Sequence, residues 1–378
     1  MPKLTIVSTH VYSGLGRKAS IHFLADAYAR RGYAVSFVSV GRGPLHRVRN
    51  KAYRTIRATV GVNQWRSYGG VSAILTEQAL EIINLRKKPL NELWGRIIQM
   101  SGCRIAAPAR QAVIDADILI IDSGVSLLFA DAVRALNPHA PLVFNAADIM
   151  ACIGAHPLLT QLEQRLALNA DVTRIPSPLM QSLLPAGARC LVAPHGLDKS
   201  VFDACRQSPY KDGTINIVSV GNTLHDAASF DLFAGALEGN VILHCFGGSV
   251  SAVTSPNVIY YGERPFAEII PYLKFADAGL AAYRVSASTA YMADSSLKMI
   301  QYRYCGLPAF VPNTIRWSYE GVITYTPGDR ESIGRALMLL LHEKRGRKIE
   351  GAPVLSWDDV AGMILAELDR SAGRRLSA

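Results

Sequence analysis

Short runs of apolar and β-branched residues alternate with helix-like segments along almost the whole chain of 378 residues. We predict strands at 4–8, 34–40, 116–122, 141–146, 172–175, 189–193, 215–221, 241–246, 257–262, 277–283 and 307–313. The segment between the first two runs is amphipathic, with Ser20 as a capping residue and Gly32 as a stop. Strands separated by helices are typical of βαβ units, which build parallel sheets. The sequence therefore predicts an α/β fold.

A polar stretch at residues 198–213, with Pro209 and Gly213, interrupts this alternation. We interpret it as a linker between two Rossmann-like, doubly wound domains, 1–200 and 213–378, that face each other across a cleft. The last helix could pack back on the first domain. Ligands of doubly wound sheets bind beyond the C-terminal ends of the strands. We therefore expect the functional site in the cleft.

Composition excludes several other classes of protein. Apolar residues make up 49% of the chain, which is enough for a large core and excludes whole-chain disorder. The chain contains no run of about 18 apolar residues, so no membrane-spanning helix is expected. The apolar stretch in the first residues, MPKLTIVSTH, is too short for a secretory signal and is typical of a first strand. The six cysteines are scattered, as in reduced cytoplasmic proteins, and form no zinc motif. We expect no metal and no cofactor.

The charge is distributed unevenly. Residues 1–110 contain 18 Lys and Arg against 4 Asp and Glu, a net +14, whereas the remainder has 22 against 26, a net −4. This asymmetry indicates a polyanionic partner, which the charge alone leaves open between anionic lipid, nucleic acid and an anionic substrate.

Residues 86–104 combine apolar and cationic side chains. The apolar residues recur at helical spacing with Lys and Arg around them: Leu90, Leu93, Trp94, Ile97 and Ile98. The pattern fits a helix lying in a membrane surface, but by itself it favours a helix that faces the core. The neighbouring run 42–57 contains cations and no carboxylate, which favours a polyanionic surface.

Two short motifs are weak indicators. Gly14-x-Gly16 follows the first strand, as in dinucleotide-binding loops, but the second strand ends without the acid that would hold a ribose. A plain turn, in which glycine supplies the positive φ, is the favoured interpretation. Residues 194–198, PHGLD, follow a strand next to the linker, where a turn is the alternative.

The stretch 282–310 is the most informative. Tyr283 ends a predicted strand, and Asp294, Ser295 and Ser296 can cap a new helix with Lys298 in its first turn and Gln301 beyond it. Free amides, hydroxyls and a Lys at a helix N-terminus can bind a diphosphate without a metal. The alternative, a capped surface helix with a solvated Lys, is favoured by position alone.

A carboxylate follows another strand. Asp148 lies just after the run 141–146, where it can act as a general base, although an Asp at such a place is more often a cap or turn residue. Asp122 is assigned a structural role.

Several of these segments together resemble the GumK-like glucuronosyltransferases (glycosyltransferase family 70). The matching stretches lie within residues 1–330: SIHFLADAYARRG, ILIIDSGVSLLFADAVRALNP, the AAD around Asp148, PHGLD, YYGE (260–263) and ADSSLKMIQYRYCGLPA (293–309). The resemblance implies a GT-B fold. It also implies inverting, metal-independent transfer of glucuronic acid from a UDP-sugar to a polyprenyl-diphosphate-linked oligosaccharide. Such an enzyme would be peripheral, at the cytoplasmic face of the inner membrane, and would act in xanthan-like exopolysaccharide synthesis.

The resemblance also implies roles for individual residues. Asp148 would be the catalytic base. The donor would be bound by Tyr283, Ser295, Ser296, Lys298, Gln301, Glu263 and Arg264. The acceptor and membrane side would include His10, Arg17, Lys18 and Trp94. Three positions depart from the family pattern: Val11 replaces an acid after His10, and Arg264 and Leu297 replace methionines of the nucleotide pocket.

Two alternatives belong to other functional classes. The Gly14-x-Gly16 loop leaves open an NAD(P)-dependent oxidoreductase, which the missing ribose-binding acid opposes. The +14 segment leaves open a non-catalytic nucleic-acid-binding protein. The repeated βαβ pattern and the lack of a nucleic-acid module oppose that second alternative, so no nucleic-acid partner is expected.

Overall fold

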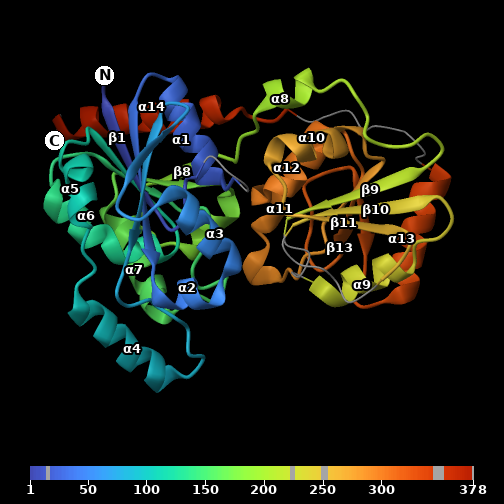
Figure 1. Ribbon diagram of the computed structural model, residues 1–378, viewed down its shortest axis with the longest axis horizontal. Helices are drawn as coiled ribbons and strands as arrows, with labels where there is room; N and C mark the ends of the chain where they lie inside the picture. The colour runs from blue at the N-terminus through green and yellow to red at the C-terminus, as the bar shows by residue number, and fades with distance from the viewer. Residues whose placement is uncertain (14–17, 222–225, 248–253, 344–352, 377–378) are drawn as a thin grey trace. The chain divides into compact units, whose positions relative to one another are not determined.

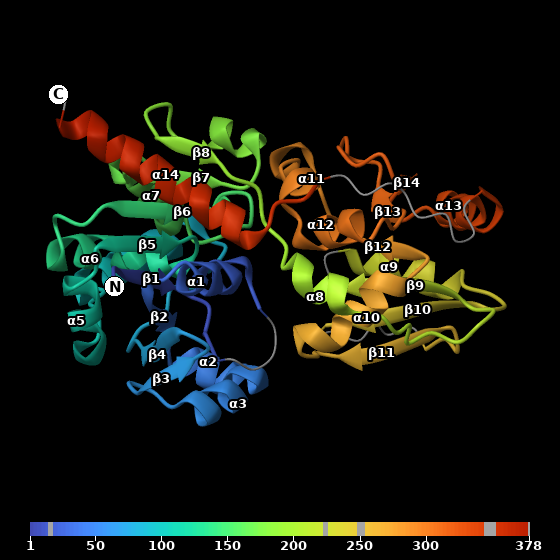
Figure 2. The same ribbon diagram turned by 90° about the horizontal axis from the view of Figure 1, so that it is seen from above.

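The computed structural model describes residues 1–13, 18–221, 226–247, 254–343 and 353–376, and it divides into two compact units. Unit 1 comprises residues 1–15, 19–194 and 357–378, and unit 2 comprises residues 16–18 and 195–356. The boundary at Pro194–His195 precedes the predicted linker, which contains a helix, α8 (Lys199–Ala204). Both units are α/β, as predicted, and their elements are shown in Figures 1 and 2.

Unit 1 is built on an eight-stranded sheet in the order β3-β4-β2-β1-β5-β6-β7-β8, in which only β3 and β4 are antiparallel neighbours. Its strands are β1 (Lys3–Ser8), β2 (Ala34–Arg42), β3 (Trp65–Tyr68), β4 (Val71–Glu77), β5 (Ile118–Asp122), β6 (Leu142–Asn145), β7 (Val172–Ile175) and β8 (Cys190–Val192). Its helices are α1 (Ser20–Arg30), α2 (Pro44–Arg49), α3 (Lys51–Val60), α4 (Lys88–Ser101), α5 (Ala107–Ile114), η1 (Val125–Phe129), α6 (Ala130–Leu136), α7 (Pro157–Asn169), η2 (Pro178–Leu183) and α14 (Trp357–Leu376).

The last helix, α14, belongs to unit 1, where it lies beside α1 and β7 (Figures 1 and 2). The rings of Phe23 and Trp357 stack with their centroids 5.6 Å apart, and Trp357 is buried. An ion pair of 2.8 Å joins the Arg30 guanidinium to Asp358 at the start of α14. Burial of the indole contributes most to this contact, because an exposed ion pair adds about 0–1 kcal/mol.

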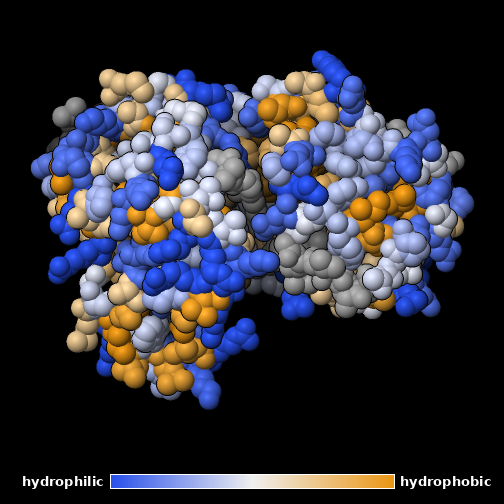
Figure 3. All heavy atoms as spheres, in the orientation of Figure 1, coloured by the Kyte–Doolittle hydropathy of each residue, from blue (hydrophilic) through white to orange (hydrophobic). Residues whose placement is uncertain are grey.

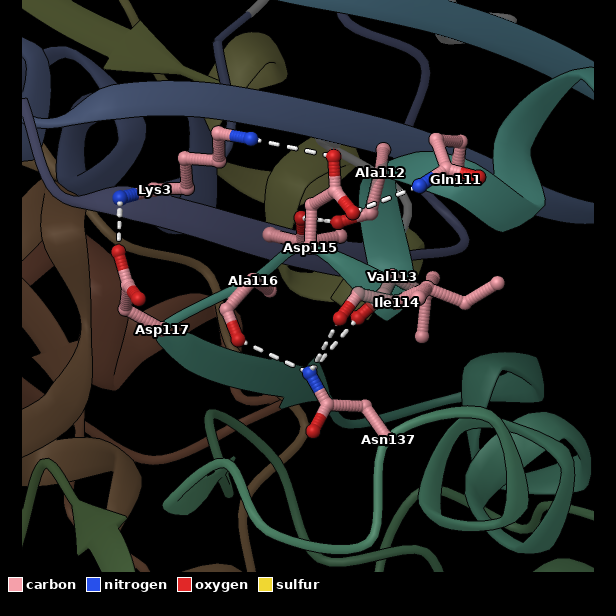
Figure 4. Close-up of polar contacts among 10 residues, drawn as sticks. Lys3, Gln111, Ala112, Val113, Ile114, Asp115, Ala116, Asp117 and Asn137 are labelled. Atoms are coloured by element: carbon pink, nitrogen blue, oxygen red, sulfur yellow. Dashed lines mark hydrogen bonds and ion pairs between the residues drawn. The ribbon is translucent and has the colours of Figure 1, made fainter.

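Polar contacts join the N-terminal ends of β1 and β5 (Figure 4). The Lys3 amide donates to the Asp117 carboxylate at 2.7 Å, and its ammonium lies 3.1 Å from Asp115. The Asn137 side-chain amide donates to the carbonyl of Ala116 at 2.9 Å. These contacts satisfy backbone groups at the edge of the sheet opposite to the C-terminal ends of its strands, where ligands of such folds bind.

Unit 2 contains a six-stranded parallel sheet in the order β11-β10-β9-β12-β13-β14. Its strands are β9 (Ile215–Val220), β10 (Val241–Phe246), β11 (Val258–Gly262), β12 (Ala278–Leu280), β13 (Ala309–Pro312) and β14 (Val322–Tyr325). Besides α8, its helices are α9 (Ala227–Gly235), α10 (Phe266–Phe275), η4 (Ala287–Thr289), α11 (Met292–Ser295), α12 (Leu297–Tyr304) and α13 (Arg330–Glu343). Two apolar cores form, one with α10 and α12 and the other with α9 and α13.

Candidate active site

The order of the strands identifies one place in each unit where a ligand is expected. In unit 1 the chain proceeds outward in opposite directions from β1 and β5, and in unit 2 from β9 and β12. At such a switch point the two following loops diverge, which leaves a hollow at the C-terminal ends of the strands. The functional side chains are therefore expected at these two edges.

Asp148 lies at the C-terminal edge of unit 1, in the loop that follows β6. Its side chain is exposed to solvent, and its backbone N–H points to the Ser123 hydroxyl at 3.3 Å. Ser123 itself follows β5, so two neighbouring loops define the position of Asp148.

A buried polar network lies at the same edge. The Asp122 carboxylate accepts hydrogen bonds from the Ser8 hydroxyl at 2.8 Å and from the Asn145 amide at 2.7 Å. Arg174 is fully buried, and it donates to the Asn145 side-chain oxygen at 3.3 Å and to the Ala193 carbonyl at 2.7 Å. Burial raises the pKa of Asp122 to about 6, against the lowering effect of its hydrogen bonds and of the Arg174 charge. This network fixes the ends of four strands below Asp148.

Three causes act on the pKa of Asp148. Desolvation raises it, the nearby Asp122 charge raises it further, and the His10 charge lowers it. The net effect is a pKa above that of an ordinary Asp. A carboxylate whose pKa is raised is a better proton acceptor near neutral pH, which suits a general base.

In unit 2, four polar side chains predicted to bind the donor lie together. Tyr283 follows β12, and the other three belong to the first turns of α12; each is less than a tenth exposed: Tyr283, Ser296, Lys298 and Gln301. The backbone of Gly221, at the end of β9, is close to the side chain of Lys298. The cluster therefore lies at the switch point between β9 and β12.

The helix begins slightly later than the sequence indicated. Ser295 ends the short helix α11, and Ser296 is the capping residue of α12, with its hydroxyl accepting from the Met299 amide at 3.3 Å. The Tyr283 and Ser296 hydroxyls are 2.6 Å apart. The two hydroxyls and the first amides of α12 thus form one polar group.

Lys298 is placed where a cation opposes the helix dipole, which costs about 0.3–1 kcal/mol unless an anion is present. Its ammonium lies 4.8 Å from the centroid of the Tyr283 ring, a cation–π contact that orients it. A locally unfavourable charge that is buried and oriented is typical of a binding site rather than of a surface helix.

Glu263 and Arg264 lie at the same edge of the sheet but farther along it. Both are exposed and follow β11, three strands from β12 in the sheet order. Three spacings of about 4.8 Å place β11 roughly 14 Å from β12. Arg264 donates to the Tyr261 carbonyl at 3.1 Å, so its guanidinium is held at the end of β11.

The residues predicted for the acceptor and membrane side are dispersed. His10 is exposed near Asp148, Lys18 is exposed just before α1, and Arg17 lies outside the described residues, as does the Gly14-x-Gly16 loop. Trp94 lies on the inner side of α4, where its indole N–H donates to the Glu81 carbonyl at 3.1 Å.

One charged residue near Asp148 was missed by sequence reasoning. Glu163 on α7 is fully buried and accepts from the backbone amide of Met150. The available signal was its position on the apolar face of a helix, between Leu159 and Leu166, where a charge is unexpected.

Two kinds of feature are absent from the described part of the chain. Within it, no group of three or more His, Cys, Asp or Glu side chains is arranged to hold a metal ion. None of its helices combines the length and the apolar character needed to cross a membrane.

Comparisons with known proteins match both the sequence and the fold. Residues 6–176 match the family model for the N-terminal domain of the glucuronosyltransferase GumK. The chain is 29% identical over 371 residues to the UDP-glucuronate:glycolipid 2-beta-glucuronosyltransferase of Xanthomonas campestris pv. campestris, covering 96% of this chain and 89% of that relative.

Two solved structures illustrate the fold. Anabaena Alr3699/HepE in complex with UDP and glucose has a TM-score of 0.61 and 11% identity, with all of both chains covered. A UDP-forming α,α-trehalose-phosphate synthase from Burkholderia xenovorans in complex with glucose-6-phosphate has a TM-score of 0.55 and 11% identity, covering 97% of this chain and 96% of that one. The similarity confirms the predicted GT-B fold class.

Proposed function

We propose that this chain, whose residues 6–176 match the family model for the GumK N-terminal domain, is an inverting glycosyltransferase. It moves glucuronic acid from UDP-glucuronic acid to a lipid-linked oligosaccharide. The observation that carries the proposal is the presence of two complementary groups. An exposed carboxylate with a raised pKa follows β6, and a buried cluster of hydroxyls and a Lys follows β12. The sequence is also similar to that of a curated glucuronosyltransferase over 96% of this chain.

The donor diphosphate is assigned to the start of α12. Backbone amides and a Lys at a helix N-terminus attract anions, and the paired hydroxyls of Tyr283 and Ser296 can donate to phosphate oxygens. Gln301, one turn beyond Lys298, is assigned to the sugar. Glu263 and Arg264, farther along the same edge, are assigned to the nucleoside end, and Ser295 borders the diphosphate.

Transfer then follows as a single displacement. Asp148 takes the proton from an acceptor hydroxyl while that oxygen forms a bond to the anomeric carbon of glucuronic acid. The bond from this carbon to the diphosphate oxygen breaks, and UDP leaves with the electron pair. Attack opposite to the leaving group inverts the anomeric configuration. Lys298 and the α12 amides stabilise the charge that develops on UDP, in the role that a divalent metal has in other transferases.

The acceptor side is assigned to unit 1 because of its charge. The net +14 of residues 1–110 complements both an anionic lipid surface and the diphosphate of a polyprenyl-linked acceptor. His10 near Asp148 and Lys18 just before α1 are assigned to this acceptor, and so, from the sequence alone, is Arg17.

The membrane contact is assigned to α4. Its outer face exposes four large apolar side chains that share one side of the helix, Leu90, Leu93, Ile97 and Met100. We call them the α4 apolar row, and Figure 3 shows hydrophobic side chains gathered over this helix. Exposed cations flank the row: Arg86, Lys87, Lys88, Arg96 and Arg104. An apolar row between cations is typical of a helix that lies in an anionic membrane surface. The row therefore supports a peripheral enzyme, and the resemblance to the glucuronosyltransferase extends the proposal to the cytoplasmic face of the inner membrane and to exopolysaccharide synthesis.

Thermal unfolding with a panel of nucleotide sugars tests the donor assignment. UDP-glucuronic acid at 100 times its Kd should stabilise the protein by about 2.7 kcal/mol, and NADH should not. Lys298→Met should remove most of this stabilisation, whereas Lys211→Met, an exposed residue of the same unit, should leave it unchanged. Equal stabilisation of the Lys298→Met variant by UDP-glucuronic acid would contradict the assignment of the diphosphate to α12.

A further inference from the structure

The loop between β6 and α7 is anchored from inside the protein by one buried carboxyl group. The amide of Met150 lies 3.1 and 3.2 Å from the two carboxyl oxygens of Glu163. Glu163 has no exposed surface, and Ile149 and Met150 are each 1% exposed. Met150 is two residues beyond Asp148, so this contact holds the backbone that carries the proposed base.

The remainder of the loop forms a compact turn that starts at this anchor. The amides of Cys152 and Ala155 donate to the carbonyls of Ile149 at 3.0 Å and Met150 at 3.1 Å. The far end is fixed by Asn84, whose side-chain amide donates to the Gly154 carbonyl at 3.0 Å. The loop is therefore connected to the protein at both ends, and Glu163 is the anchor next to Asp148.

Burial makes this arrangement costly unless it has a use. A carboxyl group on the apolar face of a helix loses its hydration, and a buried amide without an acceptor is also unfavourable. An apolar residue at position 163 would fill the same space but would leave the Met150 amide without this acceptor. The buried carboxyl group of Glu163 therefore lowers the stability of α7 but holds the loop in a defined position.

We infer that Glu163 is a positioning residue for Asp148, which acts through the amide of Met150. The inference rests on the proposed function, because it assigns Glu163 a part in the reaction at Asp148. The titratable groups that face this pair are Cys152 in the same loop, and Asp122 and His10 beside Asp148. Glu163 contacts the backbone of the loop and not the substrates, so its loss should change the position of the base and not the affinity for the donor.

Two substitutions distinguish the role of the hydrogen-bond acceptor at position 163 from the role of its negative charge. Glu163→Gln keeps an oxygen that accepts from Met150, whereas Glu163→Leu keeps the volume and removes the acceptor. Glu163→Leu should lower kcat by roughly 100-fold, the size of effect expected for a misplacement of about 1 Å, with the KM for the UDP-sugar unchanged. Glu163→Gln should restore kcat to within a few-fold of the wild type. Asp131→Asn, which removes a carboxylate that is 76% exposed, is the matched control and should have no effect.

The outcomes that overturn the inference are specific. A wild-type kcat in Glu163→Leu would do so, and so would an equal loss in Glu163→Gln, because the acceptor would then be irrelevant. If Glu163→Leu does not fold, the rate of hydrogen exchange of the Met150 amide is measured instead, in the wild type and in Glu163→Gln. Strong protection in both supports the anchor, and exchange as fast as in an open loop overturns it. Hydrogen exchange can be measured without any activity. A failure of the proposed function, seen as no transfer by the wild type, can therefore be distinguished from a failure of this inference.

Discussion

At the scale of single residues, the proposed reaction depends on a carboxylate, Asp148, that is accessible and has a raised pKa. Asp122 and Glu163 are also carboxyl groups of the same region, but both are buried and hydrogen-bonded. Asp148 alone among these three is exposed, so it is the one that can reach a substrate hydroxyl.

Replacing Asp148 by Asn should remove the proton acceptor without removing the donor site. We expect the rate of transfer to fall by about 100- to 10,000-fold, the range of a lost general base, with unchanged affinity for UDP. Initial rates together with calorimetric titration of UDP check this. Loss of UDP binding along with transfer would show that Asp148 has a structural role instead.

At the scale of elements, α12 is attached to the sheet through Tyr302. Its hydroxyl donates to the carbonyl of Val218 on β9 at 2.9 Å, and its ring lies over Gly279 of β12. A Cβ at Gly279 would lie 2.4 Å from this ring. Glycine is therefore required at position 279, so that the helix with Lys298 can lie against the switch point between β9 and β12.

Gly279→Ala should accordingly destabilise unit 2 by about 1–3 kcal/mol, the usual cost of overpacking a core. Gly235→Ala at the end of α9 is the control, since nothing lies within 4 Å of a Cβ there. Thermal unfolding with and without UDP measures both changes. A Gly279→Ala variant with wild-type stability would contradict the packing argument.

The α4 apolar row should bind to membranes. Leu93→Asp with Met100→Asp should weaken binding to vesicles that contain anionic lipid, because both side chains lie on the exposed face, at 59% and 86% exposure. Leu168→Asp, at 52% exposure on α7, is a matched control outside the row. Flotation assays at low and high salt measure the binding, which should weaken with salt. Equal flotation of the double variant and the control would contradict the assignment.

At the scale of the whole molecule, two buried carboxyl groups should make stability depend on pH. Burial raises the pKa of Asp122 to about 6 and that of Glu163 to about 7, above the values of about 4 expected in the unfolded chain. A raised pKa means that the folded protein holds its protons more tightly, so stability is highest at acidic pH for these groups and falls as pH rises from about 4 to 7. The fall is of the order of 3 kcal/mol for each group.

Glu163→Gln should remove the contribution of Glu163 to the pH dependence of stability. The variant should be more stable than the wild type at pH 8 by up to about 3 kcal/mol, with the difference vanishing near pH 4. Denaturant unfolding across this range measures it. A difference that grows toward acidic pH would have the wrong sign and would contradict the assignment of the raised pKa to Glu163.

Much of the fold was predictable from the sequence, because each of the eleven apolar runs contains a strand. The hairpin of β3 and β4, and strand β14, were not predicted. The β3 residues are mostly exposed, so they lack the apolar run on which the prediction relied. The apolar stripe of α4 was only partly informative, since Ile98 is buried and Leu93 is exposed on the same helix.

The candidate site was predictable to a different degree in each unit. Lys298, Ser296 and Tyr283 are close in sequence to one strand and one helix start, so local patterns brought them together. The group around Asp148 comes from β1, β5, β6 and α7, and no local pattern connects these segments. Glu163 illustrates the limit, because only the folded structure shows that its partner is the amide of Met150.

Transfer of label from UDP-[14C]glucuronic acid to a polyprenyl-diphosphate-linked oligosaccharide, measured in the presence of EDTA, tests the central claim most directly. We predict that label enters the lipid fraction with release of one UDP for each sugar, and that the Asp148→Asn protein transfers it at least about 100-fold more slowly. Label that stays entirely in the nucleotide fraction, under conditions where UDP-glucuronic acid stabilises the protein against heat, would contradict a transferase with this donor.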